Sequence, residues 1–330
     1  MRTIHSRVLA AGGAVAAGAA ALTYSAYRKE MDGARRRINT ERQVIDSAHG
    51  TIEFGECGDG PAVLVIHGAG GGFDQGLELG RAIVGDGYRV IAPSRFGYLG
   101  TALPADATAE AQAAAHLRLL DALQLERVPV VGVSAGAPSA MRLCLEHPER
   151  CAAMVLMVPL AWAPERTRAN MPSPFFANVL NALTESDFLF WAATKIARMT
   201  LLQTILGTPV GAYRNAGEGE RRNVDRLLHS IVPISSRAGG IRNDAVVADA
   251  LTPYALEAIR VPTLIISAAD CLYGTYESSY YTAEEIPNAR FAGFSSGGHL
   301  LLGHDREVRA LIANFLAESL ATGAQAAMAI

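Results

Sequence analysis

The amino-acid sequence predicts an α/β fold, a doubly wound and mostly parallel sheet that is interrupted by a helical insertion. Short apolar runs such as residues 62–66 and 128–133 contain no charged side chain, which is typical of strands buried on both faces of a parallel sheet. Segments with helical spacing alternate with these runs. The alternation stops at Pro159, the strand signal is lost until about Arg260, and it resumes at Thr263. One domain with an insertion is the simplest account of this pattern.

The individual elements follow from residue 42 onward. Two strands, residues 42–46 and 50–57, are expected to form a hairpin. Further strands are expected at residues 62–67, 89–92, 128–133, 151–158, 263–267 and 290–294. Helices are expected up to residue 85 and at residues 105–123, 135–147, 186–199, 218–229, 277–286 and 300–322. Pro138 falls in the first turn of its helix, where a missing N–H costs little.

The N-terminal segment has the length of a membrane span. Val8 to Tyr27 carries no charged residue and would extend roughly 30 Å as a helix, about the thickness of a bilayer core. The heavier basic flank, which includes Arg28 and Lys29, lies on its C-terminal side. We therefore predict an uncleaved transmembrane helix that anchors the protein in a membrane, with the folded domain on the cytoplasmic side. A cleaved export signal and a flexible Ala/Gly tail are the alternatives.

These observations predict a chain of four parts. They are an anchor and basic linker at residues 1–40, a core at residues 41–159 and 260–322, a helical cap at residues 160–259, and a tail at residues 323–330. The boundaries follow from where the alternation of strands and helices starts, stops and resumes.

Composition narrows the classes of function. The chain has 330 residues, half of them apolar, so it can bury a large core. Its formal net charge of −3 gives no general attraction to nucleic acid, and no nucleic-acid partner is expected. The four cysteines show neither a disulfide framework nor metal-ligand spacing, so we expect free thiols and no metal site. The oligomeric state stays open.

Ser134 is the first candidate for chemistry. It lies in the segment Gly132-Val133-Ser134-Ala135-Gly136, between an apolar strand and a helix. A nucleophilic serine on a tight strand-to-helix turn needs small neighbours, and the two glycines supply them. The turn would present the hydroxyl at the carboxyl end of the sheet. A helix-capping serine in an ordinary turn is the alternative.

A serine hydroxyl needs a base, and the base in turn needs an acid. His299 follows the last expected strand and a glycine-containing loop, and it is the preferred base over His304, which is expected inside the next helix. Asp270 follows the strand at residues 263–267 and is the preferred acid. The chain order is then Ser134, Asp270, His299. A turn or capping role is the alternative for Asp270, and Asp74 and Asp244 are weaker candidates.

A tetrahedral intermediate also needs two N–H donors directed at its oxygen. The backbone amide of Ala135, directly after the nucleophile, is the first candidate. The second is expected from residues 67–72, where small residues allow close approach of the backbone, with Ala69 preferred over Gly70. A structural role is expected for His67. A phosphate-binding loop is disfavoured because the Lys-Ser/Thr pair of such loops is missing, and no cofactor is expected.

Together these features resemble the α/β-hydrolase fold superfamily. The resemblance rests on His67-Gly68, the segment Pro93–Tyr98, the turn at Ser134, the acid after residues 262–266, and Gly297-Gly298-His299. It covers residues 50–315 without the insertion, and it implies an α/β-hydrolase fold with a cap. Many members have Asp where this chain has Ser94, and Gly where it has Ala137. Members that use an aspartate nucleophile, the epoxide hydrolases and haloalkane dehalogenases, do not match Ser134.

The sequence therefore predicts a serine hydrolase whose substrate is a hydrophobic carboxylic ester. Aromatic and methionine side chains of the insertion suit an acyl chain, although most of them are expected to pack the cap: Met171, Phe175, Phe176, Phe188, Phe190, Trp191 and Met199. The glycine loop also resembles that of carbon–carbon bond hydrolases acting on ring-cleavage products. Such an enzyme could use Arg237 or Arg242 to hold a substrate carboxylate. A non-catalytic binding protein on the same fold is the third alternative.

Overall fold

The computed structural model describes residues 2–40, 42–85, 87–164 and 182–328. It divides into two compact units, Met1–Thr40 and Glu41–Ile330. The first unit is formed by one long helix, α1 (Arg2–Asn39). Met171, Phe175 and Phe176 of the insertion lie outside the described residues.

The prediction of a transmembrane anchor is wrong. Across the described ranges, none of the helices combines the length and the hydropathy that a membrane span requires. The segment Val8–Tyr27 is helical and uncharged, but alanine and glycine dominate it, and their small side chains gain little free energy from leaving water. The expected membrane partner, membrane localisation and orientation rested on this anchor, and they are wrong with it.

The second unit contains one eight-stranded sheet in the order β1-β2-β4-β3-β5-β6-β7-β8. The first strand pairs antiparallel with β2, and β2 pairs antiparallel with β4, while all other pairs are parallel. This confirms the predicted doubly wound, mostly parallel sheet. The strands are β1 (Gln43–Ser47), β2 (Gly50–Cys57), β3 (Ala62–Ile66), β4 (Arg89–Pro93), β5 (Val128–Val133), β6 (Cys151–Met157), β7 (Thr263–Ala268) and β8 (Ala289–Phe294).

Helices cover both faces of this sheet because the central strands are apolar on both sides. In β3, Val63 and Val65 pack beneath α2 and α12, whereas Leu64 and Ile66 pack against α3 and α4. The helix α11 joins the α3 and α4 side. The helices of the core are α2 (Phe73–Ile83), α3 (Ala109–Ala122), α4 (Ala137–Glu146), α11 (Thr275–Glu285) and α12 (Asp305–Met328).

The strand order puts the topological switch point of the sheet between β3 and β5. From β3 the chain crosses to β4 on one side, whereas β5 pairs on the other side of β3 and leads on to β6. Right-handed crossovers then put α2 and α4 on opposite faces. At such a switch point the loops that leave the two strands diverge and open a crevice at the carboxyl edge of the sheet. The loop after β3 is the glycine loop, residues 67–72, and the residue after β5 is Ser134.

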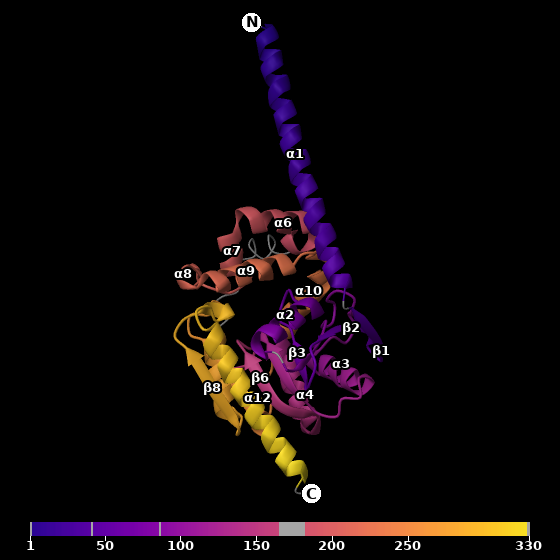
Figure 1. Ribbon diagram of the computed structural model, residues 1–330, viewed down its shortest axis with the longest axis vertical. Coiled ribbons are helices and arrows are strands. Elements are labelled where there is room, and N and C mark those ends of the chain that lie inside the picture. The colour runs from indigo at the N-terminus through magenta and orange to yellow at the C-terminus, as the bar shows by residue number, and fades with distance from the viewer. Residues whose placement is uncertain (1, 41, 86, 165–181, 329–330) are drawn as a thin grey trace. The chain divides into compact units, whose positions relative to one another are not determined.

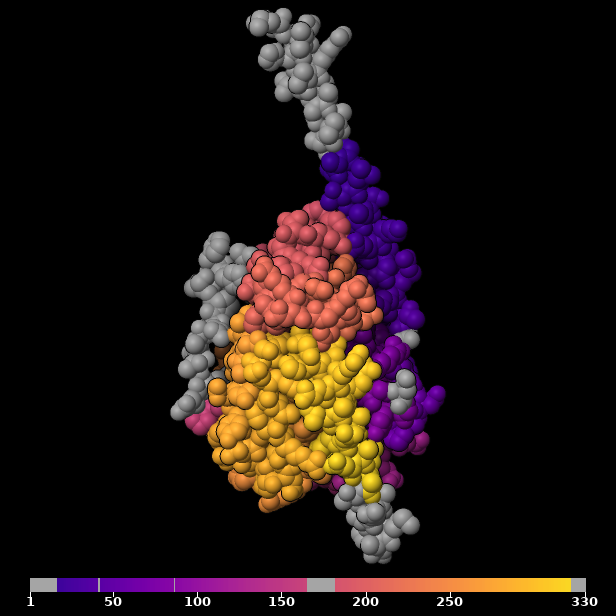
Figure 2. All heavy atoms as spheres, turned by 60° about the vertical axis from the view of Figure 1, so that its left-hand side comes forward, coloured from indigo at the N-terminus to yellow at the C-terminus, as the bar shows by residue number. Residues whose placement is uncertain are grey.

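The insertion between β6 and β7 is helical wherever it is described in regular structure. Figure 1 shows α6 to α9 as a separate layer at one end of the sheet, and in Figure 2 this layer lies directly on the C-terminal part of the core. Phe190 and Trp191 are buried, as expected of residues that pack a cap. The helices are α6 (Asp187–Ile196), α7 (Arg198–Thr204), α8 (Val210–Asn215), α9 (Glu218–Ser230) and α10 (Ala238–Asp249).

Two buried ion pairs join the insertion to the core. Arg237 Nη2 lies 2.8 Å from Asp74 Oδ2, and Arg95 Nη1 lies 2.6 Å from Asp244 Oδ1. All five N–H groups of Arg237 are used, on both carboxylate oxygens of Asp74 and on the carbonyls of Gly71, Ser230 and Ile231. This charge is therefore held in place from both the insertion and the glycine loop.

We expect Arg237→Met to lower the free energy of unfolding by about 3–5 kcal/mol, because it leaves the Asp74 carboxylate buried without its charged partner. Arg242→Met is the matched control, since the Arg242 side chain is 60% exposed and lies 3.9 Å from Glu185. That change should cost less than about 1 kcal/mol. Urea unfolding of both variants measures the difference, and equal losses would contradict the assignment.

Candidate active site

Ser134 lies on a strained turn between β5 and α4. Its φ is +50°, in the left-handed region that non-glycine residues rarely occupy. The neighbours must be small: a Cβ on Gly132 would come 2.7 Å from the Cβ of Ala140, and one on Gly136 would come 2.6 Å from the carbonyl oxygens of Ile66 and His67. This explains the spacing of the two glycines. The turn lifts the Ser134 hydroxyl out of the sheet edge, where its side chain is half-buried.

The glycine loop lies directly against the serine. A Cβ on Gly68 would stand 3.1 Å from Ser134 Cβ and 3.7 Å from its Oγ. The amide of Gly70 donates to the hydroxyl of Tyr98 at 3.2 Å, so it is already engaged. In the part of the chain that is described, the amide of Ala69 donates to no protein acceptor. This favours Ala69 over Gly70 as the second N–H donor, beside Ala135.

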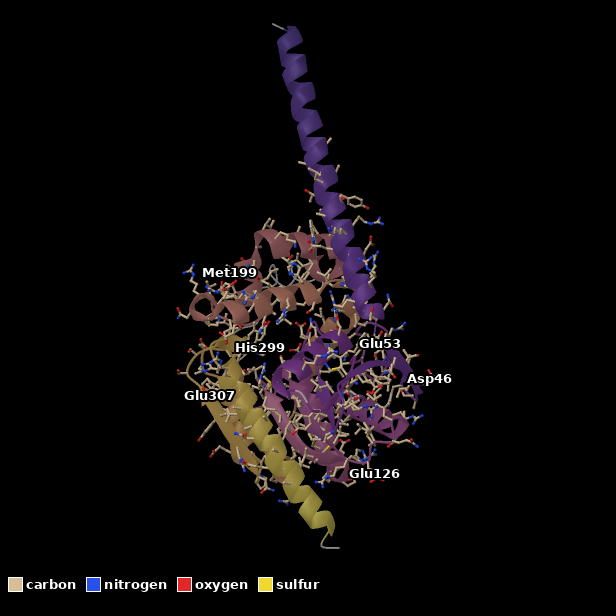
Figure 3. All side chains as sticks on the ribbon, in the orientation of Figure 1. Asp46, Glu53, Glu126, Met199, His299 and Glu307 are labelled. Atoms are coloured by element: carbon tan, nitrogen blue, oxygen red, sulfur yellow. The ribbon has the colours of Figure 1, made fainter. Side chains whose placement is uncertain are left out.

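His299 is brought onto the serine from the far end of the sheet. Its Nε2 lies 2.9 Å from Ser134 Oγ, across 165 positions of sequence. Burial lowers the pKa of His299 to about 4, so the imidazole is neutral at neutral pH. Figure 3 labels His299 where the C-terminal part of the core meets the insertion. The structure thus joins two of the predicted residues as a nucleophile and a base would be joined.

Asp270 is close to His299 in the fold, but its carboxylate does not meet the ring. Its Oδ1 accepts a hydrogen bond from the backbone N–H of Gly298 at 2.7 Å. Among the described residues, neither a hydrogen bond nor an ion pair links this carboxylate to the imidazole of His299. The predicted contact is therefore replaced by one with the loop that carries the histidine.

Cys271 takes the position beside the ring, and the sequence analysis missed it. Its Sγ lies 3.2 Å from His299 Nδ1. The only sequence signal is its place directly after Asp270, because one turn can direct either side chain toward the histidine. Sequence spacing cannot decide between two adjacent residues of an irregular turn.

The other residues weighed from the sequence have structural roles. His67 is buried, its Nε2 accepts from the Arg95 amide at 3.0 Å, and burial holds its pKa well below the usual range, which fits the expected structural role. Asp244 binds Arg95 through both oxygens and accepts from Tyr98. His304 precedes α12 instead of lying within it, and its ring stacks 4.2 Å from Phe294.

The contacts of Ser94 explain why a serine fits at this position, where many members of the superfamily have Asp. Its hydroxyl accepts from the Phe73 amide at 3.0 Å and donates to Glu53 Oε2 at 2.9 Å. The buried Glu53 carboxylate also accepts from the Gly100 amide at 3.0 Å and pairs with Arg42. A hydroxyl beside a buried carboxylate avoids the repulsion that two carboxylates would create there.

Insertion residues lie at both ends of the site. The side chain of Ile231 stands over Gly70, 3.8 Å from where a Cβ would be. The carbonyl of Gly207 accepts from the amides of both Leu272 and His299, at 2.9 and 3.3 Å. The insertion therefore contacts the loop of the expected oxyanion donors and the loop of the expected base.

This geometry can activate a hydroxyl with an uncharged base. A neutral imidazole within hydrogen-bond distance of a serine can accept its proton, and free backbone amides beside it can stabilise an oxyanion. Neither Arg237 nor Arg242 is placed to hold a substrate carboxylate: Arg237 has no unused N–H, and Arg242 is exposed beside Glu185.

Comparison with known proteins agrees with this architecture. Residues 61–304 match the family model described as alpha/beta hydrolase fold. The solved structure of an alpha/beta hydrolase fold protein from Nakamurella multipartita superposes with a TM-score of 0.67 at 25% identity, over 83% of this chain and 98% of that one.

Two curated relatives match the chain over part of its length. An uncharacterized hydrolase, YcgS, of Bacillus subtilis is 35% identical over 123 residues, 37% of this chain. A 2-hydroxy-6-oxo-6-phenylhexa-2,4-dienoate hydrolase of Comamonas testosteroni is 34% identical over 113 residues, 33% of this chain. The match spans only 41% and 40% of these relatives' own lengths.

The buried imidazoles predict how stability depends on pH. Burial lowers the pKa of His116 to about 3 and that of His299 to about 4, against about 6.5 in an unfolded chain. Below pH 6.5 the unfolded chain binds protons that the folded protein does not, so the free energy of unfolding falls as the pH drops toward 4. Each such group contributes about 1.4 kcal/mol per pH unit.

Urea unfolding between pH 7 and pH 4.5 tests this expectation in the protein and in His116→Gln. The variant should lose stability less steeply below pH 6.5, because one of the groups is removed. If the free energy of unfolding falls equally steeply with pH in both proteins, His116 binds its proton in the folded state as readily as in the unfolded chain.

Proposed function

The chain belongs to the alpha/beta hydrolase fold family, and from this premise we propose that it is a serine hydrolase that cleaves a hydrophobic carboxylic ester. The observation that carries the proposal is the 2.9 Å contact between Ser134 Oγ and His299 Nε2. The strained turn at Ser134 supports it, because backbone strain at a polar residue is concentrated at functional sites.

In the proposed reaction Ser134 Oγ attacks the ester carbonyl carbon while His299 Nε2 takes the hydroxyl proton. The amides of Ala135 and Ala69 donate to the oxygen of the tetrahedral intermediate. When the intermediate collapses, the ester C–O bond breaks and His299 gives its proton to the leaving alcohol. Water, deprotonated by His299, then attacks the acyl-enzyme and releases the carboxylic acid and Ser134.

An uncharged acyl group suits the surroundings of this site. Gly68 of the glycine loop lies against the serine, and the apolar side chain of Ile231 packs on Gly70 of the same loop. The two arginines considered as carboxylate holders are committed elsewhere. Asp270 completes the proposed set as a positioning residue that acts through Gly298.

Ser134→Ala should abolish turnover of p-nitrophenyl esters and labelling by a fluorophosphonate probe, because it removes the hydroxyl that faces His299 Nε2. His299→Gln should lower kcat by about 10⁶-fold, as the loss of the histidine base does in a serine protease. Ser296→Ala, an exposed serine in the same loop as His299, is the matched control and should keep full activity. Labelling of Ser134→Ala at the native rate would remove the serine from the mechanism.

A second candidate is hydrolysis of a carbon–carbon bond in a ring-cleavage product. The match to the dienoate hydrolase of Comamonas testosteroni favours it. The two candidates are separated by comparing kcat/KM for a panel of p-nitrophenyl esters of increasing chain length with kcat/KM for a 2-hydroxy-6-oxo-dienoate. We expect the esters to be preferred, with the optimum at an apolar acyl chain. A dienoate value that exceeds every ester would make carbon–carbon hydrolysis the function.

A further inference from the structure

The group that meets His299 on the side away from Ser134 is a thiol. Nε2 of the imidazole faces the Ser134 hydroxyl at 2.9 Å, and Nδ1 faces Cys271 Sγ at 3.2 Å. The carboxylate that could have taken this place, Asp270, is held by the Gly298 amide. No charged side chain within the described ranges lies at ion-pair distance from this ring, and burial alone lowers its pKa.

Backbone contacts fix the two loops that bring this thiol and imidazole together. The Gly207 carbonyl accepts from the amides on both loops, Leu272 and His299, and the Asp270 carboxylate accepts from Gly298 on the other loop. The ring of Tyr273 packs edge-on against the imidazole, with 4.8 Å between their centroids. These contacts direct the side chain of Cys271, the residue after Asp270, at Nδ1 of His299.

The sulfur of Cys271 is itself held in place. The residue is 6% exposed, and its Sγ accepts a hydrogen bond from Thr275 Oγ1 at 3.2 Å. Thr275 Oγ1 is in turn 3.1 Å from the buried hydroxyl of Ser267. A line of hydrogen bonds therefore runs from Ser267 through Thr275 and Cys271 to His299 and ends at Ser134.

This line has a chemical consequence for the tautomer of the histidine. To accept a proton from Ser134, Nε2 must carry the lone pair, so Nδ1 must carry the hydrogen. A sulfur that accepts the Nδ1–H bond favours that tautomer. A neutral thiol, unlike a carboxylate, adds no negative charge to stabilise the imidazolium that forms in the reaction.

We infer that Cys271 is the positioning residue of His299, fixing its ring and its Nδ1–H tautomer in the place where a carboxylate was expected. This role rests on the proposed function of His299 as the base toward Ser134. Asp270 then acts one step further away, by holding the loop at Gly298.

Titration of His299 by NMR tests the inference without a substrate. The full chain, labelled with ¹⁵N-histidine, is compared with Cys271→Asp, Cys271→Ser, Cys271→Ala and Asp270→Asn, and the resonance is assigned by its loss in His299→Gln. Asp270→Asn keeps an amide oxygen that can accept from Gly298 while removing the charge. Cys57→Ser, a half-buried cysteine in β2, is the control for loss of a thiol.

Cys271→Asp should raise the pKa of His299 by about one to three pH units, because a carboxylate then faces Nδ1. Cys271→Ser should keep the Nδ1–H tautomer, and Cys271→Ala should populate both tautomers. Asp270→Asn and Cys57→Ser should leave the pKa and the tautomer as they are. If Cys271→Asp does not fold, Cys271→Ser and Cys271→Ala decide the question through the tautomer.

The inference is overturned if Cys271→Asp leaves the pKa of His299 unchanged and Cys271→Ala leaves its tautomer unchanged, and the role passes to Asp270 if Asp270→Asn alone changes them. Ester turnover gives a second readout: Cys271→Ala should lower kcat by about 10- to 100-fold with KM nearly constant, and Cys271→Ser should restore most of it. Wild-type protein that shows the expected titration but cleaves no ester would refute the proposed function and leave the positioning role standing.

Discussion

The left-handed turn at Ser134 is the constraint on which the rest of the site depends. A φ of +50° at a serine is tolerated only because the packed elements around it leave the chain no other path. Gly132 lies against Ala140, and Gly136 lies against the carbonyls at the end of β3, with room for no side chain. The same tight packing sets the glycine loop beside the hydroxyl. One steric condition therefore fixes both the proposed nucleophile and the amides proposed as its oxyanion donors.

Buried charges then hold the glycine loop from outside. The guanidinium of Arg237 donates all five of its N–H groups, to the Asp74 carboxylate and to backbone carbonyls of the glycine loop and the insertion. Arg95 donates to the His67 carbonyl and binds Asp244 through both oxygens. Such pairs add little stability over an apolar core, but breaking one is costly, so the loop is kept in one position. Amides held rigidly in advance stabilise an oxyanion most effectively.

The base side of the site is built differently. His299 lies on a loop held by the Gly207 carbonyl and the Asp270 carboxylate, and its ring is fixed by the Cys271 thiol and the edge of Tyr273. Gly207 belongs to the insertion, so the insertion contributes to the position of the base as well as to the surroundings of the substrate. A sequence change in this part of the insertion would reach the reacting atoms through the backbone of His299.

The sequence by itself determined the sheet, its helices, the turn at Ser134 and the place of His299 after the last strand, because apolar periodicity and small residues act on the local backbone. It could not determine which group meets His299 Nδ1, because Asp270 and Cys271 share one irregular turn and only the loop at Gly298 selects between them. Nor could it show that Arg237 is fully paired, since its partners lie up to 166 positions away. The transmembrane prediction at the N-terminus relied on the absence of charged residues. An uncharged run rich in alanine and glycine lacks the apolar surface that a membrane span needs. The local sequence pattern determines the path of the backbone. Which side chains contact one another depends on distances that are set only when the chain has folded.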